Sequence, residues 1–396
     1  METKIFTQTK GKTDAKKAAE YIDEQSNAKL AIIYSSIRND EKTKEYFKYL
    51  ADNLKTPFLA LRVGGTYTLE DGYCEEAVSI VVFCGELDVT VFDEKIDFKN
   101  PQKTAENITP NLKDKNLAFI YSATYAKQLS VMDYILRIAQ EKHPKTQILG
   151  GGSAPKPIVA TKNGVFEDSI VLAAVNGLEY NFNIDTGFTF DETKKERYVV
   201  TKSDDFYVYE INNRNAIEEY SKLLHIRPYF FNKFSILLSK PSPGVIGSLA
   251  RTNPVLYEAI MKTTVEIYGT KRLDEELIRP FGLIEIDEEN DRLVFENKKP
   301  ENTELRRLII SKQNQLGVYD KLVKQYHNTS FLLLTACIFT PFWFGFDFEE
   351  VGRRLAKLKQ PFLLYFVFGE FGAKLPYKED INVVNTCVVE TLALED

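Results

Sequence analysis

The sequence has 396 residues, of which 44% are hydrophobic and 27% are charged. This composition is typical of a folded globular protein of about two to three domains and excludes an intrinsically disordered chain. Lys and Arg number 51 against 57 Asp and Glu, which gives a net charge of −6. A mildly acidic chain lacks the positive field that binds phosphate groups, so nucleic acid is not expected as a partner.

The cysteines and the apolar segments indicate a cytoplasmic protein. The four cysteines lie in apolar sequence, without the short-spaced pairs that bind zinc or exchange disulfides: Cys74, Cys84, Cys337 and Cys387. Residues 1–17 lack the apolar segment of a secretory signal. The uncharged segment 325–346 is long enough to cross a bilayer, but its polar residues and Pro341 predict a strand and a turn. We therefore expect reduced thiols and no membrane span.

Three segments of the sequence repeat one order of predicted elements: a strand, a helix, a second strand that ends at glycine, and a closing strand. The predicted first strands are 30–36, 117–123 and 331–336, the helices 41–54, 130–142 and 348–358, the second strands 57–63, 147–149 and 361–368, and the closing strands 77–84, 169–175 and 381–392. Strand-helix-strand units of this length pair their strands in parallel, and the closing strand makes each sheet mixed. The predicted fold class is α/β with α+β-like additions, built from repeated units and two interlocked halves.

Between the repeats the sequence predicts antiparallel hairpins and further helices. Hairpins are expected at 159–166, around Asn163-Gly164, and at 197–211 and 281–295, whose acidic turn reads as solvated rather than metal-binding. Helices are expected at 215–224, 254–268 and 302–326, the last interrupted near Gly317.

Small and hydroxyl-bearing residues end the first strands of the repeats, and glycines follow the second strands. Ligands of parallel α/β sheets bind beyond the carboxyl ends of strands, so both sets should converge on one edge. Glycine also allows close backbone approach, so exposed amides in these turns would cradle a carboxylate or phosphate. The alternative is that the glycines only turn the chain. The glycine-rich run does not have the order of a P-loop or a dinucleotide site.

Glu370 is the most informative ionisable residue, because it lies between Phe368 and Phe371 in an apolar strand. Burial of an unpaired carboxylate costs several kcal/mol, so Glu370 needs a partner. That partner is either the ammonium of a ligand or backbone amides within the turn.

Several short motifs resemble one family. The sequence Gly150-Gly151-Gly152-Ser153-Ala154 and the following segment 161–165 resemble the central signature of the FIST domain family. Segments 335–337, 368–372 and 384–386 resemble its C-terminal signature in the same order. The resemblance runs from about residue 28 to the C-terminus. The sequence departs from the family at two positions: Pro155 stands where the family usually has an acidic residue, and Val384 where it often has a histidine.

The resemblance implies an N-terminal extension at 1–27, a FIST N-terminal domain at 28–212 and a FIST C-terminal domain at 213–396. It also implies an intracellular sensory module that binds a small molecule, such as an amino acid, and signals through a separate protein partner. The candidate ligand-binding residues are Ser35, Gly64, Gly65, Ser122, Gly151, Gly152, Ser153, Cys337, Gly369, Glu370 and Asn385.

Three alternatives stay open. Some relatives bind haem and respond to nitric oxide, and the candidate axial ligands for haem here are the three histidines His143, His225 and His327; no other cofactor or metal is expected. An enzyme would use Glu370 and Cys337, although the sequence shows no complete set of acid, base and nucleophile. The aromatic segment 342–348, which contains Trp343, is read as core packing, with a ligand lid, a scaffold surface or a homodimer contact as alternatives.

Overall fold

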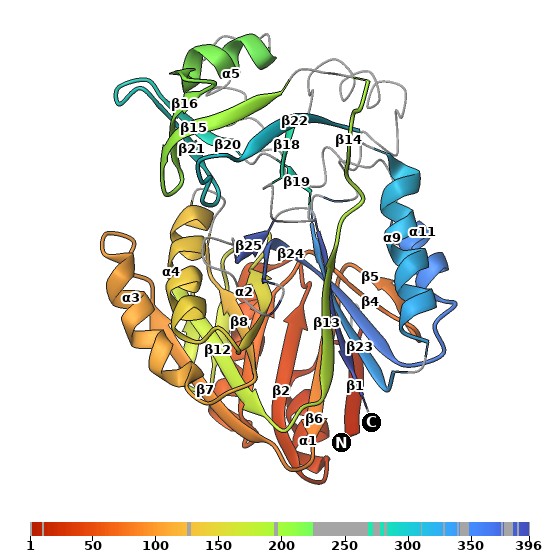
Figure 1. Cartoon of the computed structure of the whole chain (residues 1–396). Helices are drawn as coiled ribbons and strands as arrows, with labels where there is room; N and C mark the ends of the chain where they lie inside the picture. The colour runs from red at the N-terminus through yellow and green to blue at the C-terminus, as the bar shows by residue number, and fades with distance from the viewer. Residues whose placement is uncertain are drawn as a thin grey trace.

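The computed structural model describes residues 2–9, 12–124, 128–193, 197–224, 268–271, 278–280, 283–309, 311–327, 329–338, 340, 348–373, 375, 383–385 and 388–395. Within these residues the chain forms an α/β fold with three sheets. Figure 1 shows two of the sheets with their helices in the lower part of the molecule and the third sheet above them. The predicted fold class is confirmed.

The three predicted repeats are present as three structural units. The first contains β2 (Ala28–Ser35), α2 (Asp40–Asn53), β3 (Phe58–Arg62) and β6 (Val78–Cys84); the second β8 (Leu117–Ser122), α4 (Leu129–Lys142), β9 (Gln147–Gly152) and β12 (Ser169–Asn176); the third β23 (Phe331–Cys337), α11 (Phe348–Leu355), β24 (Phe362–Gly372) and β26 (Val389–Leu394). In each unit the first two strands pair in parallel and the closing strand pairs antiparallel with the first. The apolar strands are buried on both faces, as their sequence predicted.

The units interlock through strands that cross between them. β9 and β24 pair antiparallel, so the second and third units share one sheet, which β7 (Asp88–Lys95) and β13 (Tyr180–Asp185) close at its edges. The first unit has its own sheet, with β1 (Glu2–Gln8) at one edge. Two hairpins join another unit: β10 (Val159–Thr161) and β11 (Gly164–Phe166) extend β3, and β4 (Thr66–Thr68) and β5 (Gly72–Cys74) extend β24.

The two lower sheets pack face to face between layers of helices. Their inner faces share one core, to which β2 contributes Leu30 and Ile32 and β8 contributes Phe119. The helices that cover the outer faces are α1 (Ala15–Glu24) with α2 on the first sheet, and α3 (Pro101–Ile108), α4, α9 (Lys312–Gln325) and α11 on the second. A single-turn 3-10 helix, η1 (Thr109–Leu112), follows α3.

The third sheet is antiparallel and lies between the second and third units in the sequence. Its strands are β14 (Thr189–Phe190), β15 (Tyr198–Asp204), β16 (Tyr207–Ile211), β17 (Arg214–Asn215), β18 (Tyr268–Lys271), β19 (Arg279–Pro280), β20 (Leu283–Asp287), β21 (Arg292–Phe295) and β22 (Glu304–Ile309). The predicted hairpins correspond to β10 with β11, β15 with β16 and β20 with β21. α5 (Ala216–Leu224) begins where predicted, and Asn215 Oδ1 accepts from Glu218 N at 3.0 Å.

The long helix predicted at 302–326 is wrong in its first half. Residues Glu304–Ile309 form β22, because Leu305 and its neighbours pair with β15 and β18, which the local sequence does not reveal. The helix begins only after Ser311, whose hydroxyl caps it by accepting from Asn314 N at 3.2 Å, and it continues through Gly317 without interruption. Most of the helix predicted at 254–268 lies outside the described residues.

Candidate functional site

The carboxyl ends of the parallel strands meet, as the sequence predicted. Gly64 N, just after β3, donates to Phe366 O of β24 at 2.9 Å. Ala154 N, just after β9, donates to Arg62 O at 3.0 Å. Segments from all three units therefore converge at one place in the fold.

Most of the predicted residues there have their polar atoms satisfied by the protein itself. Ser153 Oγ lies 2.6 Å from Lys156 O and accepts from Ile158 N at 3.0 Å. Ser122 Oγ lies 2.8 Å from Thr124 Oγ1. Gly65 uses its carbonyl to accept from Phe366 N at 3.2 Å. These groups join the units to one another.

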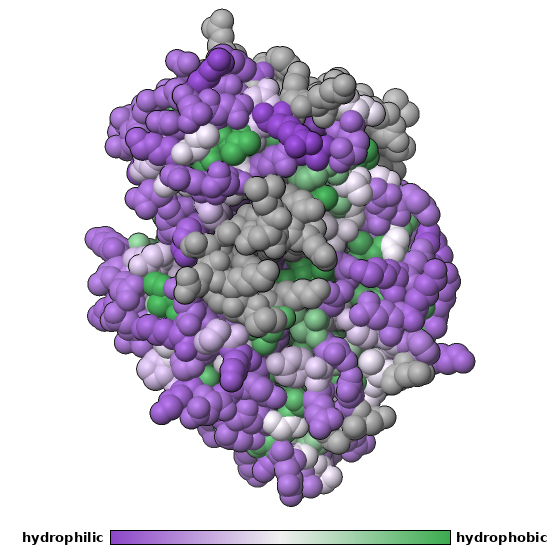
Figure 2. Space-filling model, viewed as in Figure 1, coloured by the Kyte–Doolittle hydropathy of each residue, from purple (hydrophilic) through white to green (hydrophobic). Residues whose placement is uncertain are grey.

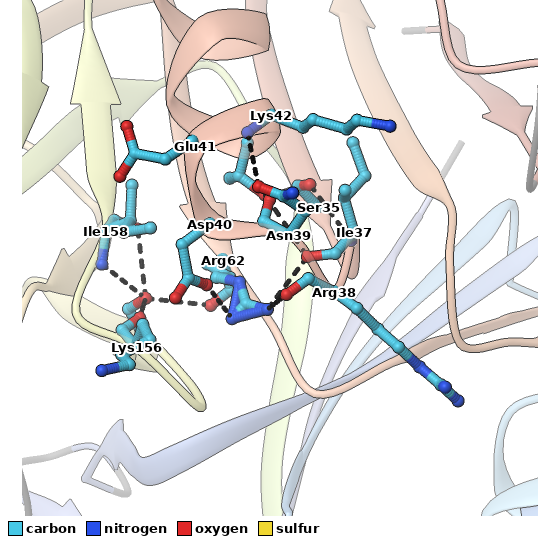
Figure 3. A network of polar contacts seen from close by, with 12 residues as sticks. Ser35, Ile37, Arg38, Asn39, Asp40, Glu41, Lys42, Arg62, Lys156 and Ile158 are labelled. Atoms are coloured by element: carbon cyan, nitrogen blue, oxygen red, sulfur yellow. Dashed lines mark hydrogen bonds and ion pairs between the residues drawn. The ribbon is translucent and has the colours of Figure 1, made fainter.

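A buried arginine fixes the loop after Ser35. The side chain of Arg62 is 4% exposed, and its Nη1 lies 2.9 Å from Asp40 Oδ1. Its Nη2 donates to Ile37 O and Arg38 O at 2.9 and 3.0 Å, so the guanidinium holds the segment between β2 and α2 (Figure 3). Ser35 lies in this network, where its Oγ accepts from Ile37 N at 3.4 Å. Burial lowers the pKa of Arg62, and Asp40 opposes that effect.

The glycines at 150–152 are not a turn, which corrects the prediction. They lie within β9, paired with β8 on one side and β24 on the other. A Cβ atom at Gly150 would lie 1.7 Å from Ile120 O, and one at Gly152 would lie 2.3 Å from Phe368 O. Glycine is needed here for close approach of strands, and the amides of Gly151 and its neighbours belong to the ladder.

Three further predicted residues and Glu390 form a buried acidic cluster, which we define as Cys337, Glu370, Asn385 and Glu390. Gly369 has φ +76° and forms a bulge in β24, after which Glu370 pairs with Asn385 of β25 (Val384–Asn385). Asn385 Nδ2 donates to Gly372 O at 2.7 Å and to Glu390 Oε1 at 3.0 Å. All four side chains are buried.

Glu390 is the member that the sequence analysis missed. It lies on β26 opposite Thr335 and is fully buried. The signal that singled out Glu370, an acid inside an apolar strand, is also present in the sequence Val388-Val389-Glu390. The same reasoning applied to the closing strand would have found it.

The electrostatics of the cluster favour a proton or a cation. Burial raises the pKa of Glu370 well above its ordinary value, and Cys337 and Glu390 raise it further. The only hydrogen bond to this carboxyl from a described backbone amide is a long one, 3.5 Å from Val388 N to Oε2. Within the described chain, Glu370 Oε1 has no hydrogen-bond partner and no Lys or Arg pairs with Glu370.

A row of buried hydroxyls adjoins the acidic cluster. Tyr34 Oη lies 2.8 Å from Tyr121 Oη, which lies 3.4 Å from Tyr365 Oη. Each tyrosine comes from a different unit, and all are fully buried. Burial raises their pKa values well above the ordinary value, and Glu390 adds to the rise for Tyr121 and Tyr365. These phenols therefore stay protonated and give the inter-sheet core a polar centre.

The described histidines do not fit haem. His327 is exposed, and its Nδ1 lies 2.9 Å from Lys324 O in the last turn of α9. His143 is half-buried at the end of α4. Neither offers a buried imidazole beside an apolar surface. His225 and most of the aromatic segment, including Trp343, lie outside the described residues, as does Cys387. In the described part of the chain, no three His, Cys, Asp or Glu side chains are grouped to hold a metal ion.

Comparison with known families supports the resemblance seen in the motifs. Residues 29–214, from β2 to the start of β17, match the family model described as the FIST N domain. No curated protein matches the chain. None of the helices that the structure describes has the length and apolar character needed to span a membrane. Among the coloured residues on the face shown in Figure 2, most are hydrophilic, and the apolar ones form small scattered groups. Residues 29–214 therefore carry a FIST N domain.

Proposed function

We propose that this protein is a sensory protein whose ligand is a small metabolite with a cationic amino group, an amino acid or a related compound, bound at the acidic cluster. The FIST domain is a sensory module for small ligands. The observation that carries the proposal is Glu370, a fully buried carboxyl without a cationic partner in the described chain. A buried carboxylate is stable only when a positive charge or a proton compensates it.

An ammonium group matches the acceptors that the cluster offers. It donates three hydrogen bonds, and Glu370 Oε1 and Asn385 Oδ1 are buried acceptors without a partner among the described residues. Glu390 adds a second buried carboxyl beside them, and its interaction with Glu370 raises the pKa of Glu370. Ligand binding then exchanges a proton on Glu370 for the ligand's cation.

Hydrogen bonds connect the segment that carries Asn385 to α4 and to the third sheet, so binding of a ligand can affect both. Asn385 follows Val383, whose amide donates to Asp133 Oδ1 of α4 at 2.9 Å, and Asp133 Oδ2 accepts from Lys298 N beside the third sheet at 3.2 Å. We propose that the ligand favours one arrangement of these parts and that a separate signalling protein recognises this arrangement.

Because the described cysteines form no disulfide with one another, we place this function in the cytoplasm.

The test is a thermal-shift screen of the purified chain against amino acids and simple amines at millimolar concentration, followed by calorimetric titration of any hit. A ligand that binds the native state raises the unfolding midpoint. Glu370→Gln removes the charge with little change in shape and should abolish the shift. The control is Glu219→Gln on α5, another nearly buried carboxyl, which should bind as the wild type does.

Two results would contradict the proposal. One is the absence of any shift across the panel, and the other is a ligand that binds Glu370→Gln as tightly as wild type. An absorption spectrum before and after addition of haem tests the haem alternative on the same sample, and a Soret band would favour it.

Catalysis by Cys337 is not favoured by this geometry. A reactive cysteine needs its thiolate, and the thiolate is stabilised by neighbouring positive charge. Cys337 instead lies beside the Glu370 carboxyl, whose pKa it helps to raise, and a carboxyl supplies no positive charge. We therefore assign Cys337 a role in shaping the binding site.

A further inference from the structure

The helix α9 buries two polar side chains on one face, which we call the α9 polar pair: Gln315 and Tyr319. They are four residues apart, so they lie one above the other on the helix. Both are fully buried. Gln315 also falls on the helical stripe that continues through Tyr319 and Leu322, where an apolar residue is the ordinary choice.

The polar atoms of the pair are not used by the described protein. Gln315 Nε2, Gln315 Oε1 and Tyr319 Oη have no hydrogen-bond partner among the described residues. A buried polar group left unpaired costs about 1–3 kcal/mol. Leucine and phenylalanine at these positions would remove that cost, so the two polar side chains do not serve the stability of the fold.

The pair adjoins the acidic cluster. Tyr319 packs in the same core cluster as Cys337, and Glu370 contributes to raising the pKa of Tyr319 beyond the effect of burial. Gln315 packs closely against Gly187, where an added Cβ would lie 2.2 Å from Gln315 Oε1. The Tyr319 end of the pair therefore lies near Glu370, and Gln315 lies one helical turn further along α9.

We infer that Gln315 and Tyr319 form a second subsite, which binds a hydrogen-bonding group that the ligand carries close to its ammonium. The inference rests on the proposed function and adds a requirement to it. Gln315 offers one acceptor and a donor, and the protonated Tyr319 hydroxyl offers another donor. A carboxylate or a carboxamide matches this set. A carboxylate is acceptable there because the ligand's own ammonium faces Glu370, whereas a simple amine would leave the pair unsatisfied.

The experiment compares ligands that differ only at this second group. Each series contains an amino acid, its amide and the corresponding amine, for example leucine, leucinamide and 3-methylbutylamine, and the phenylalanine series likewise. Affinities are measured by calorimetry for wild type, for the double variant Gln315→Leu/Tyr319→Phe, and for the control variant Gln313→Leu/Tyr326→Phe, which changes α9 and the residue that follows its last turn.

For the wild type and the control we expect the amine to bind at least about tenfold more weakly than the amino acid or the amide. In the double variant this difference should vanish, while the unliganded protein unfolds at an equal or higher urea concentration. Equal affinities within a series for the wild type, or a difference that persists in the double variant, would overturn the subsite and leave the acidic cluster standing. Failure of every compound to bind wild type would overturn both.

Discussion

The hydroxyl groups of Tyr34 and Tyr121 lie 2.8 Å apart although 87 residues separate them in the sequence. They occupy the same place in the first strands of the first and second units, so the repeat brings two equivalent residues into contact between the sheets. Their rings are nearly perpendicular, at 85°, and Tyr365 of the third unit packs against Tyr34 with ring centroids 4.2 Å apart.

Tyr121→Phe should lower the free energy of unfolding by about 1–2 kcal/mol, because it leaves the Tyr34 hydroxyl buried with its bond removed. The double variant Tyr34→Phe/Tyr121→Phe should recover part of this loss, since both polar groups are then gone. Urea unfolding measures both, with Tyr49→Phe on the surface of α2 as control. A double variant that loses the sum of the two single effects would show that the hydroxyl pair carries no coupling.

The repeats and their strand directions could be predicted because each unit encodes its own order of apolar strand, helix and glycine. What could not be predicted depends on partners far away in the sequence. The sequence predicts a turn at glycines 150–152. Their pairing with β24 could not be predicted, because β24 is more than 200 residues away in the sequence. β22 was expected to be helical for the same reason.

The candidate site was predicted in part. The structure brings three of the candidate residues together, Cys337, Glu370 and Asn385, and of these the sequence marks Glu370 by its apolar surroundings. Ser35, Ser122 and Ser153 were included because hydroxyls at strand ends often bind ligands, but here they bond to neighbouring backbone or hydroxyl groups. Sequence shows which residues are polar and near strand ends, and only the structure shows which of them already have partners.

Replacement of glycine by alanine should have opposite effects on stability at Gly150 and Gly317, because their surroundings differ. Gly150→Ala places a methyl 1.7 Å from Ile120 O, a backbone atom that cannot move away, so the variant should lose about 3 kcal/mol or more. Gly317→Ala lies inside α9 with no atom within 4 Å of the new methyl, so it should gain about 0.5–1 kcal/mol from helix propensity. Urea unfolding of both variants measures the change. A lower free energy of unfolding for Gly317→Ala would show that the new methyl group meets a neighbour of α9.

Asp133 should tie the third sheet to the segment that carries Asn385. It is 1% exposed, pairs with Arg137 at 3.3 Å and accepts from the amides of Val383 and Lys298. Arg137 in turn pairs with Asp205 at the β15–β16 turn. Asp133→Asn keeps the shape but removes one of the carboxylates that pair with Arg137 and weakens the bonds to both amides, so we expect a loss of about 1.5–3 kcal/mol.

Hydrogen exchange localises that loss. The amides of Val383 and Lys298 should exchange faster in Asp133→Asn, whereas the exposed variant Asp52→Asn should leave both unchanged. Unchanged protection of both amides in Asp133→Asn would mean that other contacts hold these segments together.

The raised pKa of Glu370 predicts how stability varies with pH in the absence of ligand. The folded protein holds the proton to a higher pH than the unfolded chain does, so the stabilising contribution is complete below about pH 4.3 and is lost as pH rises through the folded pKa. Glu370→Gln cannot lose a proton. Its stability relative to wild type should therefore increase between pH 6 and pH 8, by up to about 1.4 kcal/mol per pH unit.

Urea unfolding at pH 6, 7 and 8 measures this difference, and Glu219→Gln provides the opposite case. Lys222 lowers the pKa of Glu219, so that carboxyl is ionised in both states across this range and its replacement should shift stability by a constant amount. If Glu370→Gln also gave a constant difference, the Glu370 carboxyl would ionise as readily in the folded protein as in the unfolded chain. A cation would then not be needed to compensate it, and the central argument for an ammonium ligand would fail.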